Sequence, residues 1–137
     1  MKIAKELALF GVGGGAYVGL ELLWRGRSHS SMFLAGGLCF VIIGELNRAK
    51  PRRPAVLRML TGAGIITAVE LAVGLAANRD YSIWDYRQQW GNFLGQVCPM
   101  FSLLWMPLTL AAEWVYWQAD RQLAARLPLS APQKMEE

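Results

Sequence analysis

Four long blocks of apolar residues divide this sequence and limit its possible folds more than any other feature. The blocks run from Leu7 to Trp24, Ser31 to Asn47, Val56 to Asn78 and Phe93 to Trp117. Each is near the roughly 20 residues that a helix needs to cross the hydrocarbon layer of a bilayer. The blocks lack the alternating pattern of barrel strands, and backbone polar groups in lipid must be satisfied within the segment. The sequence therefore predicts an all-α membrane protein with four transmembrane helices.

The composition excludes several other classes of protein. With 54% hydrophobic residues among 137, the chain has room for one transmembrane domain over residues 1–122, followed by a disordered cytoplasmic tail over 123–137. Cys39 and Cys98 both lie inside apolar blocks, which argues against a disulfide scaffold or a zinc site. There is no P-loop, and His29 has no nucleophile-and-acid pattern around it. We expect no enzyme activity, no cofactor and no bound metal.

Positive charge is distributed unevenly between the two sides of the predicted membrane domain. Four spans place both termini on one side, and ten of the 14 Lys and Arg residues fall there: Lys2, Lys5, Arg48, Lys50, Arg52, Arg53, Arg58, Arg121, Arg126 and Lys134. The positive-inside rule then predicts a multi-pass protein of the bacterial cytoplasmic membrane with both termini in the cytoplasm. A signal peptide is the alternative for the first block, and nucleic-acid binding is the alternative for the basic loop. We favour a membrane span for the first block and a cytoplasmic loop for the basic residues, and expect no nucleic-acid partner.

Two segments of the sequence weakly resemble two others, which suggests an internal repeat. Residues 15–22 align with 64–71, and residues 34–39 align with 93–98. Two spans in each half predict two parallel two-helix repeats. The third and fourth spans are separated by a connection in which aromatic and charged residues alternate, Asn78 to Trp90. We interpret it as a short interfacial segment, acting either as an anchor or as a lid.

Glutamates inside the apolar blocks are the strongest functional signal. Glu21 and Glu70 lie well within the first and third blocks, and a carboxylate at membrane depth usually faces a bundle interior or a wet cavity. Thr67 lies one helical turn before Glu70 and shares its face. The alternative is a structural role, with Arg25 as the partner of Glu21. Glu45 and Glu113 lie nearer the inner ends of their blocks and are expected at the interface.

Small residues recur at four-residue spacing in the first and third blocks. The two ladders contain Gly11, Gly15 and Gly19, and Gly64, Ala68 and Ala72. Small residues at this spacing let helix backbones approach closely. We therefore expect packing through these ladders, either within one chain or across a homo-oligomer.

Several motifs are similar to a bacterial family described as putative ABC-transporter type IV, a permease label. They are residues 16–33 with Gly36 to Cys39, then residues 83–86 and 92–98 with Ser102 to Trp105. The resemblance implies a small multi-span protein of the bacterial cytoplasmic membrane with a substrate pathway. The matching positions include Trp84, Asp85 and Asn92, which we add to the candidate site. An ATPase or another membrane protein is a possible partner.

Three hypotheses about function follow. The first is a transporter or permease subunit with a polar intramembrane site built on glutamates. The second is a membrane scaffold or regulatory module that acts on a partner protein without transporting anything. The third is a recognition surface for lipid or peptide formed by residues 84–86.

Overall fold

The computed structural model describes residues 2–50 and 52–126, and four helices account for most of them. They are α1 (Lys2–Arg25), α2 (Ser30–Ala49), α3 (Ala55–Ala77) and α4 (Pro99–Arg126). No strand occurs in the described part of the chain, where only an isolated bridge joins Phe93 to Val97. The all-α prediction is confirmed.

Three of the helices are long and apolar enough to cross a membrane: Ile3–Arg25, Ser30–Ala49 and Ala55–Ala77. These bounds agree with the first three predicted blocks to within a few residues at most ends. Large apolar side chains point outward from the helices, including Leu7, Leu20, Leu60 and Leu75. Such extensive apolar exposure is costly in water and is what a lipid-facing surface requires.

The fourth block differs from its prediction. Residues 93–98 are not helical, and α4 begins at Pro99 and continues to Arg126. Proline lacks a backbone N–H and fits the first turn of a helix, so Pro99 starts α4 and does not kink it. Only Pro107 lies inside the helix. α4 is not among the helices that meet the length and hydropathy required of a span, so three of the four predicted spans are supported.

The predicted repeat and tail are also affected by these bounds. Residues 34–39 lie within α2, whereas their aligned counterpart, residues 93–98, forms turns and a bridge. The second aligned pair therefore does not share a local structure. The first four residues of the predicted tail belong to α4, and the rest of the tail lies outside the described residues.

α2 contacts α1, α3 and α4, and α4 likewise contacts the three other helices. α1 and α2 are antiparallel neighbours that approach closely at glycines. A Cβ at Gly13 would overlap the Phe40 ring, and a Cβ at Gly37 would lie 2.7 Å from the Phe10 ring. Leu9, Phe40 and Tyr116 form a buried cluster that joins α1, α2 and α4.

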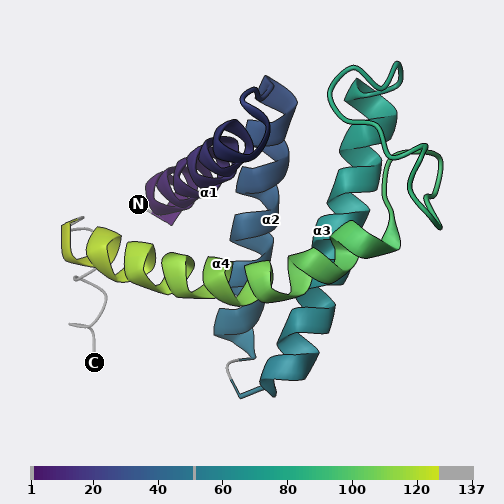
Figure 1. The fold of residues 1–137 in the computed structure, drawn as a ribbon. Coiled ribbons are helices and arrows are strands. Elements are labelled where there is room, and N and C mark those ends of the chain that lie inside the picture. The colour runs from purple at the N-terminus through teal and green to yellow at the C-terminus, as the bar shows by residue number, and fades with distance from the viewer. Residues whose placement is uncertain (1, 51, 127–137) are drawn as a thin grey trace.

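α4 ties the other helices together. Its first half packs on α3, and its second half reaches α2 and α1 (Figure 1), where the Asp120 carboxylate lies 2.8 Å from both Lys5 and Arg48. The ladder glycines Gly11, Gly15, Gly19 and Gly64 face open space within the chain, and Ala68 and Ala72 are exposed. The predicted ladders are therefore not used for packing inside the described chain.

Candidate functional site

A cavity of about 390 Å³ lies among the four helices. Its walls are almost entirely apolar, and Glu70 is their one charged side chain. Tyr17, Cys39 and Trp84 are the other lining residues that carry a polar atom or thiol. An apolar pocket with a few convergent polar groups is the usual form of a small-molecule site.

Glu70 is buried in α3, with 9% of its surface exposed. Its carboxylate accepts a hydrogen bond of 2.9 Å from the Tyr86 hydroxyl and one of 3.2 Å from the indole N–H of Trp105. Both donors are neutral, and no Lys or Arg of the described chain forms a salt bridge with Glu70. The cavity wall thus holds a carboxylate whose charge no cation of the described chain balances.

Tyr86 belongs to the connection between α3 and α4, yet its ring points inward. It stacks on Phe101 at the start of α4, with ring centroids 4.9 Å apart. Burial raises the pKa of the Tyr86 phenol, and the adjacent Glu70 charge raises it further. The phenol therefore keeps its proton at neutral pH and remains a donor to Glu70.

The other predicted polar residues of the spans have different roles. Glu21 forms an ion pair of 2.7 Å with Arg25 one turn later, which is the structural alternative considered for it, and it does not line the cavity. The Thr67 hydroxyl lies 2.8 Å from the Ser102 hydroxyl, so it joins α3 to α4. Of the two candidate glutamates, only Glu70 reaches the cavity.

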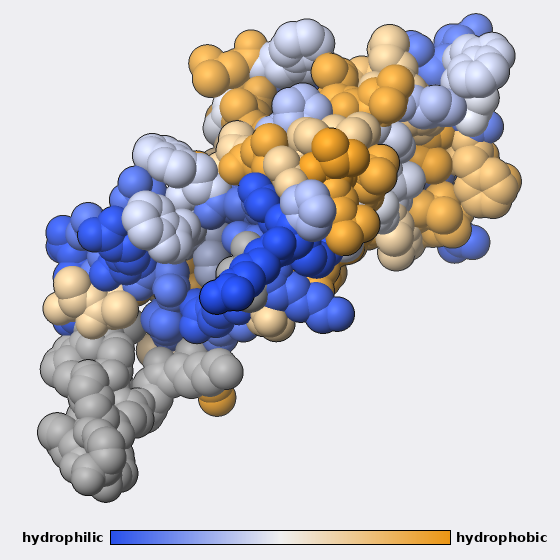
Figure 2. Space-filling model, turned by 90° about the horizontal axis from the view of Figure 1, so that it is seen from below, coloured by the Kyte–Doolittle hydropathy of each residue, from blue (hydrophilic) through white to orange (hydrophobic). Residues whose placement is uncertain are grey.

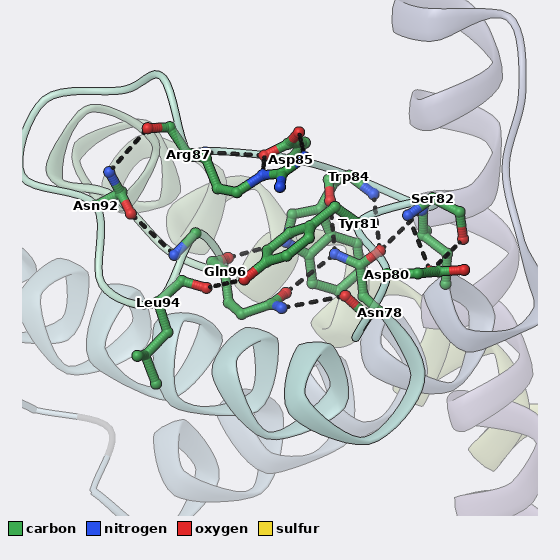
Figure 3. A network of polar contacts seen from close by, with 12 residues as sticks. Asn78, Asp80, Tyr81, Ser82, Trp84, Asp85, Arg87, Asn92, Leu94 and Gln96 are labelled. Carbon is green, nitrogen blue, oxygen red and sulfur yellow. Dashed lines mark hydrogen bonds and ion pairs between the residues drawn. The ribbon is translucent and has the colours of Figure 1, made fainter.

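The connection between α3 and α4 is folded against the helices through a buried amide network (Figure 3). Asn78, at the end of α3, is fully buried, and Gln96 is 2% exposed. The Asn78 side chain donates to the backbone oxygen of Trp84 at 2.6 Å and to Gln96 Oε1 at 3.0 Å. In turn, the Trp84 indole donates to the backbone oxygen of Gln96 at 2.9 Å. The network fixes Trp84 in the cavity wall.

Trp84 is 5% exposed and Tyr86 is partly buried, so residues 84–86 do not form the exposed recognition surface of the third hypothesis. Only Asp85 points outward. The guanidinium of Arg87 hydrogen-bonds it at 2.7 Å and, with the Arg87 backbone N–H, lowers the pKa of Asp85 to about 2. Asn92 accepts from the backbone N–H of Gly95 at 2.9 Å and orders a turn. Asp85 and Asn92 lie outside the cavity lining.

Sequence reasoning missed Asn78 and Gln96 as site residues and gave no role to Trp105. The sequence gives one indication for Asn78: it is an amide at the end of an apolar block, and a buried amide needs hydrogen-bond partners. Gln96 and Trp105 had no such signal, because their partners lie on other segments.

Charged residues gather at the opposite end of the molecule from this connection. Figure 2, which views that end, shows hydrophilic surface over the α2–α3 connection and the second half of α4. The exposed basic residues there include Arg48, Lys50, Arg52 and Arg121. Glu113 is buried nearby and accepts from Arg58 at 2.9 Å, while Glu45 accepts from the Tyr116 hydroxyl at 2.9 Å. These four basic side chains therefore lie at one end of the described part of the chain.

A comparison with protein families finds a match for most of the chain. The family model described as "Putative ABC-transporter type IV" matches residues 21–134. The chain belongs to this family. No curated protein and no solved structure matches it. The family match covers α2 to α4 and the end of α1, and hence most of the cavity wall and the whole amide network. Family membership and three apolar helices together indicate a membrane protein with a predicted role in transport.

Proposed function

We propose that this family member is a transport subunit of a membrane permease, and that its solute path runs through the cavity containing Glu70. The observation that carries the proposal is the position of Glu70. A carboxylate at membrane depth costs several kcal/mol unless it is used or paired. Glu70 faces a cavity and has only neutral hydrogen-bond donors, whereas Glu21 and Glu113 each have an arginine.

Transport is tested without knowing the solute. Everted membrane vesicles from bacteria that make the protein are given ATP and a mixture of sugars, amino acids, organic anions and organic cations, and their contents are measured by mass spectrometry. We expect at least one solute to accumulate with the wild type and to fall to the level of vesicles without the protein in Glu70→Gln. Ala16→Trp should also reduce accumulation, because Ala16 is exposed and lines the cavity, so the larger indole would obstruct the solute path.

Leu23→Trp is the matched control for bulk. It adds an indole to the same helix at a side chain that is 87% exposed and lies outside the cavity lining. If Ala16→Trp and Leu23→Trp changed solute accumulation equally, the solute path would not run through this cavity. If no solute depends on the protein at all, a scaffold or regulatory role replaces transport.

We also propose that the subunit acts as a homo-oligomer in the bacterial cytoplasmic membrane with an ATPase as a partner, and that α4 crosses the membrane as a fourth span, so that both termini are cytoplasmic. The α3 ladder supports the oligomer, because Gly64, Ala68 and Ala72 are exposed together on one face. An Ala68→Cys variant lacking Cys39 and Cys98 should form a disulfide-linked dimer in membranes. A monomer under the same oxidation would exclude this face. A fluorescent protein fused to the C-terminus should fluoresce if that end is cytoplasmic.

A further inference from the structure

The chemistry of the cavity restricts what it can bind. Apart from Glu70, the walls offer aliphatic and aromatic side chains. A hydrated metal ion needs several oxygen ligands, and this lining presents only one carboxylate. An anion would meet the Glu70 charge in a medium of low dielectric constant, where repulsion is strong. The lining thus suits a ligand with a large apolar part and one positive charge.

The opening of the cavity points to the same kind of ligand. The exposed residues of the lining are Ala16 and Leu20 on α1 and Ala111 on α4. Ala16 and Leu20 lie in the apolar stretch of a helix long enough to cross the membrane. An opening bordered by apolar side chains at this depth faces the hydrocarbon layer. Amphipathic molecules that partition into a bilayer can reach it without crossing water.

We propose that the cavity binds an amphipathic organic cation, with its apolar body against the helices and its charge beside Glu70. This assignment rests on the proposed function, since it names the solute class for the same site. Charge complementarity supports it, because Glu70 lacks a cation among the described residues. Tyr17 and Trp84 also line the cavity, and aromatic faces attract cations most strongly where water is excluded.

The test compares two ions of equal shape and opposite charge. Equilibrium dialysis of radiolabelled tetraphenylphosphonium and tetraphenylborate against the full-length protein in neutral detergent gives the two affinities, with protein-free micelles as the baseline. We expect saturable binding of the phosphonium and none of the borate. Glu70→Gln should weaken phosphonium binding at least tenfold, because the side chain keeps its size and loses its charge.

Two further variants keep the test decisive if Glu70→Gln folds poorly. Glu45→Gln makes the same change on α2 outside the cavity lining, and its phosphonium affinity should equal that of the wild type. Ala16→Trp should weaken binding at least fivefold, since the exposed position admits the indole without disturbing the core.

The outcomes separate this inference from the proposed function. Equal affinities for the two ions, absence of phosphonium binding to the wild type, or unchanged binding in both Glu70→Gln and Ala16→Trp would overturn the cation assignment. Transport through the cavity would still stand if the vesicle assay found a neutral or anionic solute that depends on Ala16. Phosphonium binding in the absence of any transported solute would instead support a binding role and overturn the permease role.

Discussion

Replacing Asn78 with alanine should detach the connection between α3 and α4 from the helices. The Asn78 side chain is fully buried and makes four hydrogen bonds: to the Trp84 backbone oxygen, to Gln96 Oε1, and from the backbone N–H groups of Ile83 and Trp84. At about 1 kcal/mol net for each bond, Asn78→Ala should cost about 4 kcal/mol. The cost is local, since these partners all belong to residues 83–96.

Hydrogen exchange measured by mass spectrometry or NMR reports this local opening. The amides of Tyr86 and Gln96 are suitable reporters, because they bond to the backbone oxygens of Gly95 and Phe93 and not to Asn78. A cost of about 4 kcal/mol corresponds to a loss of protection of roughly a thousandfold. Amides in the middle of α2 should keep their protection.

Asn92→Ala is the matched control in the same connection. Asn92 makes three hydrogen bonds but is partly exposed, so water replaces its contacts and the expected cost is at most about 1 kcal/mol. If Asn78→Ala reduced the protection of Tyr86 and Gln96 no more than Asn92→Ala does, the amide network would not hold the connection in place, and the reasoning would be wrong.

Three further predictions concern packing, ion pairing and pH. Gly62→Ala should lower the free energy of unfolding by about 1–3 kcal/mol, because its Cβ would overlap the buried Thr109 of α4. Gly15→Ala is the matched control outside the proposed α3 interface: nothing lies within 4 Å of its Cβ, so it should be neutral or slightly stabilising in the same detergent titration. Arg58→Met should lower the free energy of unfolding by up to about 3 kcal/mol, because it leaves Glu113 buried without its partner. Adding Glu113→Gln should recover part of that loss, and a double variant less stable than Arg58→Met would contradict this explanation. Arg87 lowers the pKa of Asp85 to about 2 from 3.8. The stabilisation from this ion pair should therefore be constant from pH 7 to about 4.5 and fade only as the pH falls from near 3.8 through 2. A titration of Asp85 near pH 6, seen as a change in tryptophan fluorescence, would refute the lowered pKa.

The sequence located the first three helices well, because helix length and continuous hydropathy are properties of neighbouring residues. It failed at the fourth block. Residues 93–98 are apolar enough to extend a span, yet Leu94 and Gly95 adopt positive φ angles and the segment turns back on the helices. Pairing of Gln96 with Asn78, 18 residues earlier, favours this turn, and a hydropathy average contains no term for such a contact.

The glycines of α1 show the same limit. The four-residue spacing predicted packing through Gly11 and Gly15, and nothing in the sequence favoured Gly13 or Gly14. In the structure Gly13 and Gly14 meet α2, while Gly11 and Gly15 face away from it. The position of a neighbouring helix decides which glycines are buried, and that position depends on contacts along its whole length.

By itself, the sequence determined that the chain is an all-helical membrane protein whose Lys and Arg residues lie near or beyond the ends of the apolar blocks, because both properties follow from runs of local residues. Only the tertiary structure separated Glu21 from Glu70, two carboxylates in similar apolar surroundings. Glu21 has its arginine four residues away on the same helix. Glu70 is held by Tyr86 and Trp105, from a folded connection and another helix. The chemistry of a buried carboxylate depends on which groups surround it in space, and folding alone brings those groups together.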